Sequence, residues 1–201
     1  MPKRTEWRRL VRPLLPGDWR LHQSERLAYR IPVDWVLHGI LADGSISGEF
    51  YLHRLHMPLT VPCGGGLDLT YSPRHTRGTQ TYATDSPDLP RVLTEAIRLV
   101  EREAARRSVL RSKPGPVRGD EIRGYELLLA GRAAGAVRRL DRVSRYYPDG
   151  VNWVAEVQRR VAGMAALIRA DPAEAVQCLE GWRANNLRDL KIVDAEAGPD
   201  V

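Results

Sequence analysis

The sequence contains only two cysteines, Cys63 and Cys178, among its 201 residues. Two thiols cannot build a disulfide framework and cannot by themselves hold a structural zinc ion. No apolar run reaches the about 18 residues that a membrane-spanning helix needs, and the N-terminal segment lacks the apolar stretch of a signal peptide. We therefore expect a cytoplasmic protein in a reducing compartment, with no membrane contact.

Signatures of catalysis and of metal binding are also missing. His53 and His56 would point to opposite faces of a strand, and no Asp or Glu at a matching spacing supplies a third metal ligand. Cys63 precedes three glycines in a pattern that matches no nucleophile motif, and these glycines lead into a predicted strand, whereas a phosphate-binding loop leads into a helix. We predict no catalytic residue, metal or cofactor. We expect a non-enzymatic protein, with a hydrolase or transferase as an open alternative.

What the sequence does have is an uneven distribution of basic charge. The net charge is +6, and it divides into +5 over residues 1–30, −2 over 31–86, +4 over 87–118 and −1 over 119–201. Both basic segments are predicted to be helical, at residues 3–15 and 87–113, and we expect them to present one basic face. Its members are Arg4, Arg8, Arg12, Arg98, Arg102 and Arg106.

This basic face suits an acidic surface on a protein partner, because complementary charge accelerates association. Nucleic acid is the alternative ligand, since basic side chains also neutralise phosphates. Glutamates are interleaved in the second basic segment, and that segment has no aromatic side chains on which bases could stack. We therefore predict a protein partner first and nucleic acid second.

The hydrophobic pattern of the N-terminal half predicts a sheet between two helices. Apolar residues repeat at three- and four-residue spacings in the first helix, and Ser86-Pro87 is typical of the start of the second. Between them, alternation of apolar and polar residues predicts four strands, at residues 27–31, 35–41, 46–57 and 67–72. This order predicts an α+β fold: a four-stranded antiparallel meander flanked by helices, followed by an all-α helical-hairpin region.

The dipeptide Asp43-Gly44 predicts a tight hairpin, because glycine readily adopts the positive φ of a type I′ turn. A two-residue turn there places Leu41 opposite Ile46 and leaves the other face with His38 near Glu49.

A polar loop follows the predicted fourth strand and supplies the candidate binding residues. Loops outside regular elements commonly carry binding side chains, and arginines offer planar donors for carboxylates or phosphates. Two residues on the polar face of the hairpin are added to the loop residues. The set is Arg74, His75, Arg77, Tyr82, Tyr51 and His53.

Proline and glycine at residues 112–118 indicate a linker between two domains. The predicted organisation is a sheet domain over residues 1–111, helical hairpins over 119–187 and a C-terminal tail over 188–201. An internal repeat of 39 residues matches Ala136 with Ala175 and Leu140 with Leu179. Residues 120–185 thus resemble tetratricopeptide-type helical hairpins, although the period is longer than that family's about 34 residues.

Three further segments resemble an uncharacterised bacterial α+β family. They are Gly-Glu-Phe-Tyr-Leu at 48–52, Met-Pro-Leu-Thr-Val-Pro at 57–62 and Leu-Asp-Leu-Thr-Tyr-Ser-Pro-Arg at 67–74, and the resemblance covers residues 17–110. Such families have no established catalytic residues, and some members lie beside toxin or anti-phage genes. The resemblance implies an immunity or accessory role, so we predict a non-enzymatic protein–protein interaction module.

Overall fold

The computed structural model divides the chain into two compact units. The first, called the sheet unit, contains Met1–Pro58, Cys63–Val109 and Leu187–Val201, and the second, called the helical unit, contains Leu59–Pro62 and Leu110–Asn186. The residues that the structure describes are 3–23, 26–44, 49–67, 69, 72–75, 80–105, 115–146 and 152–193.

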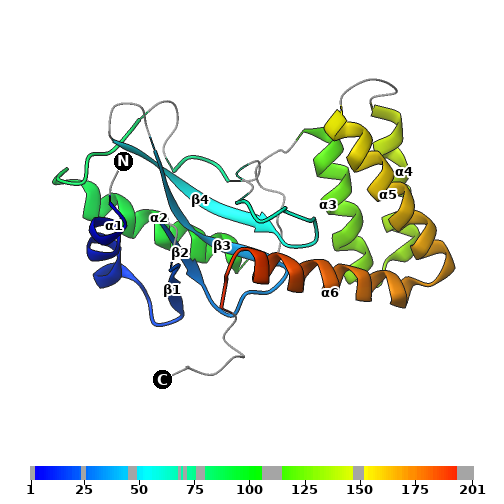
Figure 1. Cartoon of the computed structure of the whole chain (residues 1–201), viewed down its shortest axis with the longest axis horizontal. Coiled ribbons are helices and arrows are strands. Elements are labelled where there is room, and N and C mark those ends of the chain that lie inside the picture. Colours follow the sequence, from blue (N-terminus) through cyan, green and yellow to red (C-terminus); the bar gives the residue numbers. More distant parts are fainter. Residues whose placement is uncertain are drawn as a thin grey trace. The chain divides into compact units, whose positions relative to one another are not determined.

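The sheet unit is built on a four-stranded antiparallel sheet. Its strands are β1 (Trp19–Leu21), β2 (Leu27–Arg30), β3 (Val36–Gly44) and β4 (Phe50–Pro58), paired in that order (Figure 1). The predicted α+β meander is therefore confirmed, but its strands are not all the predicted ones. The three-residue β1 was not predicted, and the described residues of the predicted strand 67–72 lie outside any strand.

The predicted register of the central hairpin is wrong. In the structure Gly44 pairs with Phe50 and Leu41 pairs with His53, so both Asp43 and Gly44 belong to β3 and not to a two-residue turn. His38 consequently lies opposite His56 instead of near Glu49. The error has a physical cause. Both faces of β3 and β4 are largely buried, so the alternation of apolar residues does not select one register.

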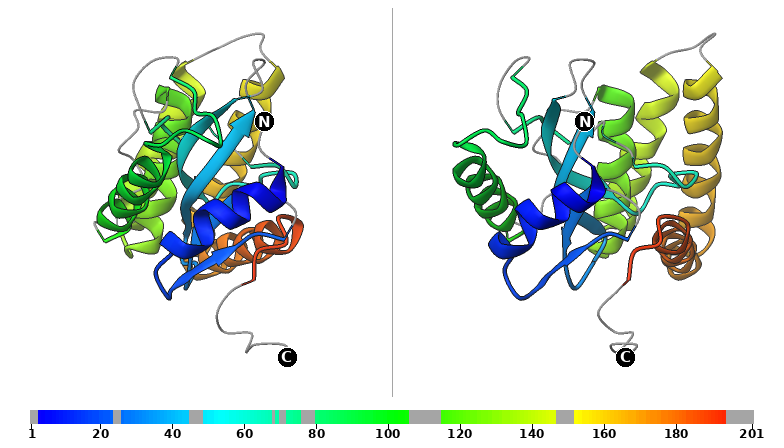
Figure 2. Two further views of the ribbon diagram at one scale, coloured as in Figure 1. Left: turned by 90° about the vertical axis from the view of Figure 1, so that its left-hand side faces the viewer. Right: turned by 60° about the vertical axis from the view of Figure 1, so that its left-hand side comes forward.

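One face of the sheet is covered by α1 (Arg4–Val11) and α2 (Leu89–Ala104) (Figure 2). The amphipathic patterns of both helices predicted this packing. A short 3₁₀ turn, η1 (Arg12–Leu14), follows α1. Trp7 of α1 meets Phe50 of β4 edge to face, with ring centres 6.0 Å apart. The apolar residues of α2 that face the sheet are all buried: Leu89, Val92, Leu93, Ala96, Ile97 and Val100.

The last described segment of the chain also belongs to the sheet unit. The buried His22 ring pairs through Nε2 with the carbonyl oxygen of Leu190 at 2.7 Å. The backbone N–H of Val193 donates to the Tyr29 hydroxyl at 3.3 Å. Residues predicted to be a loose tail, 188–193, are thus hydrogen-bonded to the sheet unit, while residues 194–201 lie outside the described part of the chain.

The helical unit consists of α3 (Pro116–Leu129), α4 (Ala133–Tyr146), α5 (Asn152–Ala170) and α6 (Pro172–Asp189), the last up to Asn186. The first three lie side by side, and α6 runs across them (Figures 1 and 2). Residues 116–118, part of the predicted linker, already form the first turn of α3. The tetratricopeptide resemblance stays a prediction.

The repeat positions of α4 and α6 are equally buried. Ala136 and Ala175 are fully buried, and so are Leu140 and Leu179 within about one per cent. The connections that precede these two helices differ, because three residues separate α3 from α4 and a single residue, Asp171, separates α5 from α6.

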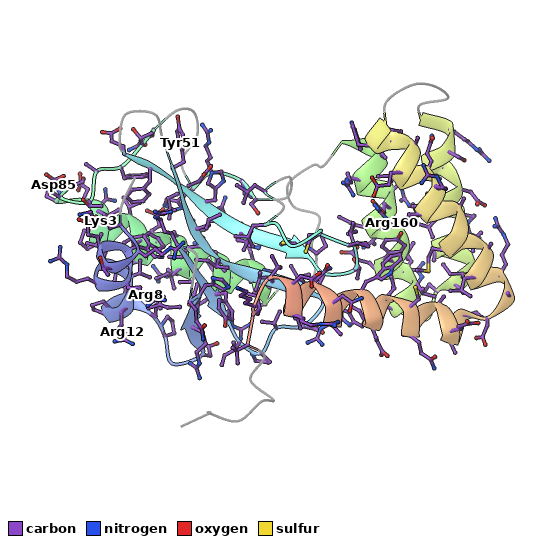
Figure 3. All side chains as sticks on the ribbon, viewed as in Figure 1. Lys3, Arg8, Arg12, Tyr51, Asp85 and Arg160 are labelled. Carbon is purple, nitrogen blue, oxygen red and sulfur yellow. The ribbon has the colours of Figure 1, made fainter. Side chains whose placement is uncertain are left out.

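A buried carboxylate connects α3 with α5. Glu121 is fully buried and accepts two hydrogen bonds from Arg160, at 2.8 and 2.7 Å, and one from the Tyr125 hydroxyl at 3.3 Å. Arg160 is labelled in Figure 3. Burial and the Glu121 charge raise the pKa of Tyr125 well above its ordinary value. Because this buried carboxylate is hydrogen-bonded to side chains of both α3 and α5, it holds these two helices together.

Candidate functional site

Four polar side chains meet where the end of α2 crosses the sheet, and we call them the histidine network: His38, Arg54, His56 and Glu103. The two histidines are opposite each other in the β3–β4 ladder, and their Nδ1 atoms are 2.8 Å apart. Glu103 of α2 joins them from the neighbouring layer, with Oε2 2.7 Å from His56 Nε2 and Oε1 2.5 Å from the Arg54 guanidinium. The network therefore fastens α2 to the sheet by charge as well as by apolar packing.

The hydrogen bonds of the network determine where its protons lie. A carboxylate only accepts, so His56 donates from Nε2 to Glu103. In a neutral His56 the Nδ1 atom is then unprotonated and can only accept a hydrogen bond. His38 therefore donates to it from its own protonated Nδ1. The unprotonated Nε2 atom of His38 therefore lies at the end of this series of hydrogen bonds, opposite Glu103.

This arrangement resembles a proton relay in form, but the pKa of its outer histidine does not suit one. Burial, His56 and Arg30 lower the pKa of His38 from 6.5 to about 3. Burial also lowers the pKa of His56, although Glu103 opposes that shift. A general base works best when its pKa lies near the working pH, so a histidine that stays neutral far below pH 7 is poorly matched to proton abstraction. The network is better explained as a structural one.

The predicted loop residues are divided between the two faces of the sheet. Arg74 forms a bridge to His53 in β4, and its guanidinium lies 3.8 Å from the centre of the Tyr51 ring. The next residue, His75, donates its backbone N–H to Leu52 and faces the other way, toward the charges of α2. The structure thus brings Arg74, Tyr51 and His53 together but separates His75 from them.

Two of the predicted binding residues are buried. Tyr82 is buried, exchanges two backbone hydrogen bonds with Phe50, and belongs to the core. His53 is buried as well, with Nδ1 3.2 Å from the carbonyl oxygen of Ser72. Arg77 lies outside the described residues.

The predicted basic face is dispersed over two helices. Arg8 donates to the carbonyl oxygens of His22 and Gln23, so it holds α1 against the residues that follow β1 (Figure 3). Arg4 at the start of α1 and Arg12 at the start of η1 are exposed. Arg98 and Arg102 of α2 are exposed and line an open hollow, and Arg106 lies outside the described residues.

A stronger concentration of positive charge lies between α3 and α4, where the sequence did not predict it. A groove of about 270 Å³ runs along this helical hairpin. Its positions repeat every three or four residues on each helix, which places them on facing sides. We call it the arginine groove, lined by Arg123, Leu127, Arg132, Gly135, Arg138, Arg139 and Arg142.

Among the residues that the structure describes, two of the five arginines in the groove have an acidic partner. Arg123 donates to Glu126 at 2.8 Å, and Arg139 donates to Asp120 at 2.8 Å. Within the described ranges, the side chains of the other three arginines make no hydrogen bond or ion pair. They are Arg132, Arg138 and Arg142.

The turn between the helices places the first of these free arginines. Gly131 has φ of 71°, which favours glycine, and its N–H donates to Leu128 while the N–H of Arg132 donates to Leu127. These two bonds form a Schellman motif, which ends α3 and directs the chain back along it. Arg132 is thereby fixed at the mouth of the groove.

Sequence reasoning missed the groove because it summed charge along the chain. Residues 119–201 carry −1 in total, which hides a local excess of arginine on one side of a hairpin. The available signal was the three- and four-residue spacing of the arginines on α4, read together with Arg123 on α3.

Other kinds of site receive no support. Within the described part of the chain, no three His, Cys, Asp or Glu side chains are grouped so that they could hold a metal ion. In that same part, every helix is too short or too polar to cross a membrane. Comparison with protein-family models, curated protein sequences and solved structures finds no significant match to the chain.

Proposed function

We propose that this protein is a non-enzymatic interaction module that binds an acidic partner protein through the arginine groove. The observation that carries the proposal is the set of three arginines that have no acidic partner among the described residues. Like charges placed close together repel, and carboxylates from a partner would relieve that repulsion. The planar guanidinium also pairs with a carboxylate through two parallel hydrogen bonds, which gives directional recognition.

The lining of the groove favours a protein over a nucleic acid. None of its seven residues is aromatic, so bases would find no stacking surface. Leu127 and Gly135 form an apolar strip between the arginines, which phosphate groups would not use. Arginine around an apolar centre is typical of the residues that contribute most to protein–protein binding.

Affinity purification from the native cell with three versions of the full chain tests this function. We expect the wild-type protein to retain a stoichiometric acidic protein that elutes as salt rises, because the contact is electrostatic. The groove variant R132Q/R138Q/R142Q should lose it. The matched control R4Q/R9Q/R12Q removes the same charge from exposed positions of α1 and η1 and should retain the partner. A partner that stays on the groove variant, or that nuclease treatment removes, would overturn the proposal.

A second candidate function is nucleic-acid binding by α2, favoured by one observation. Arg91, Arg98 and Arg102 are all exposed and line one open side of that helix. A gel-shift titration at low salt with R91Q/R98Q/R102Q tests it, since the phosphate contribution is largest there. Absence of binding by the wild-type protein would exclude this function.

The identity of the acidic partner is a finer proposal. A toxin or a defence effector is the class implied by the resemblance of residues 17–110, and sequencing the gene neighbours of the chain would test that class independently of binding.

A further inference from the structure

A glycine in the middle of the arginine groove exposes the apolar floor. Gly135 lies in the first turn of α4, and Leu127 of α3 faces it and is only partly buried. A Cβ added at Gly135 would lie 3.6 and 3.8 Å from the two Leu127 methyl carbons and 3.9 Å from Arg138 Nη2. These are ordinary contacts, so a side chain at this position would fit, and one larger than that of alanine would cover Leu127.

Glycine is therefore not required here by packing or by backbone conformation. It is unfavourable within helices relative to alanine, because it loses more conformational freedom on folding. Because glycine has no side chain, it leaves Leu127 accessible between the guanidinium groups that line the groove.

We propose that the arginine groove takes an acidic segment of the partner that places one apolar side chain over Gly135, against Leu127, between carboxylates that pair with the free arginines. This inference rests on the proposed function and names the chemistry of the segment that is bound. Charge complementarity selects an acidic segment, and the exposed apolar floor selects an apolar residue within it.

The size of the groove supports a side-chain-sized anchor. Its volume of about 270 Å³ is at or below the about 300–1,000 Å³ of typical small-molecule sites. The lining also has a single apolar side chain, Leu127, which matches one apolar residue of a partner and not an extended apolar surface.

Two labelled peptides separate charge from the apolar anchor. One is Glu-Asp-Glu-Leu-Glu-Asp-Glu, and the other carries Ser in place of Leu. By fluorescence anisotropy with the full chain at low salt, we expect the Leu peptide to bind about tenfold more tightly, as burial of one such side chain implies. The Gly135→Leu variant keeps all five arginines but fills the floor, and it should lose that tenfold preference. The Gly135→Ala variant, which adds one methyl group, should keep most of it.

The outcomes distinguish the inference from the function beneath it. If both peptides bind equally and Gly135→Leu changes neither affinity, the apolar anchor is overturned and the acidic partner stands. If neither peptide binds at low salt, the acidic partner is overturned as well. If a DNA duplex displaces both peptides at lower concentration than an unlabelled Leu peptide does, the groove is a phosphate site and the inference fails. If Gly135→Leu does not fold, the affinities of the two peptides for the wild-type chain still test whether the groove binds an apolar anchor.

Discussion

The histidine network and the arginine groove both gather charged side chains between neighbouring elements, but their charges are neutralised differently. In the network, the Glu103 carboxylate contacts both Arg54 and His56, and side-chain exposure is only 10–17% for all three. In the groove, three guanidinium groups have no acidic partner among the described residues. A buried cluster whose positive and negative charges neutralise each other stabilises the fold, whereas an open cluster with an excess of positive charge is available to a ligand.

The position of Glu103 supports the structural role of the network. It lies in the last turn of α2, where a negative charge interacts unfavourably with the helix dipole. The contacts to Arg54 and His56 compensate for that cost. Arg138, in the middle of α4, gains nothing from the helix dipole and has no acidic partner among the described residues.

Removal of the shared carboxylate should have the largest effect. We expect Glu103→Ala to lower the free energy of unfolding by about 3 kcal/mol, because it leaves a nearly buried Arg54 without a partner. Urea denaturation measures this. The control is Glu101→Ala on the same helix, which should change stability by less than about 0.5 kcal/mol. Equal effects of the two variants would mean that the network contributes no specific stability.

Acid should also weaken the network and not the groove. The unfolded chain protonates His38 near pH 6.5, while the folded chain does so only near pH 3. Stability is therefore complete above pH 6.5 and falls as pH decreases, by about 2 kcal/mol at pH 5 from this residue alone. His56 and Arg30 are the titratable and charged groups that act on His38, and Glu103 and Arg54 act in turn on His56.

The variant His38→Gln keeps a hydrogen-bond donor for His56 and cannot be protonated. Denaturation at pH 7.5 and at pH 5 should show that its loss of stability in acid is smaller than that of the wild type by about 2 kcal/mol. His56 and His75, whose pKa values are also lowered by burial, keep the remaining acid sensitivity. An unchanged pH dependence would show that His38 is protonated equally in both states.

Much of the fold follows from the sequence, and the failures have definite causes. The buried stripes of α1 and α2 were predicted because each helix has one apolar face. The hairpin register was predicted wrongly because β3 and β4 are largely buried on both faces, so no exposed face opposed the turn that Asp43-Gly44 indicated. The strand β1 is too short to show alternation.

The candidate site was harder to predict from the sequence than the fold. The groove depends on which sides of α3 and α4 face each other, and hydrophobic periodicity alone does not specify where the polar residues of two helices converge. The His38–His56 contact depends on the register that the pattern could not select.

Two glycines of the helical hairpin should respond oppositely to alanine. A Cβ at Gly124 would lie 2.5 Å from Leu140 Cδ2, whereas a Cβ at Gly135 meets only ordinary contacts. We expect Gly124→Ala to destabilise by about 1 kcal/mol, since overpacking outweighs the gain in helix propensity. Gly135→Ala should stabilise by about 0.5–1 kcal/mol. Thermal unfolding of both variants tests these two expectations. If Gly135→Ala also destabilises the protein, there is no space for a side chain beside Leu127.

The smallest expected effect concerns repulsion within the groove. Arg138 and Arg142 are four residues apart on α4, so they repel each other, and Arg138→Glu would replace repulsion with attraction, with the acidic residue in the favourable position N-terminal to the basic one. We expect stability to rise by about 0.5 kcal/mol at low salt and the gain to shrink as salt screens it. Thermal unfolding across salt measures this. A loss of stability would show that Arg138 already has a favourable partner.

The hydrogen bonds of Asn186 limit how this protein can be dissected. Its buried side-chain amide donates to the carbonyl oxygens of Leu59 at 2.9 Å and Val61 at 2.8 Å, residues that precede the helices by about fifty positions. A fragment that begins at residue 110 would lack both acceptors, so the Asn186 amide would lose both of these hydrogen bonds. Limited proteolysis between the units should therefore give a nicked but associated molecule, and the helical unit is best studied by substitution within the intact chain.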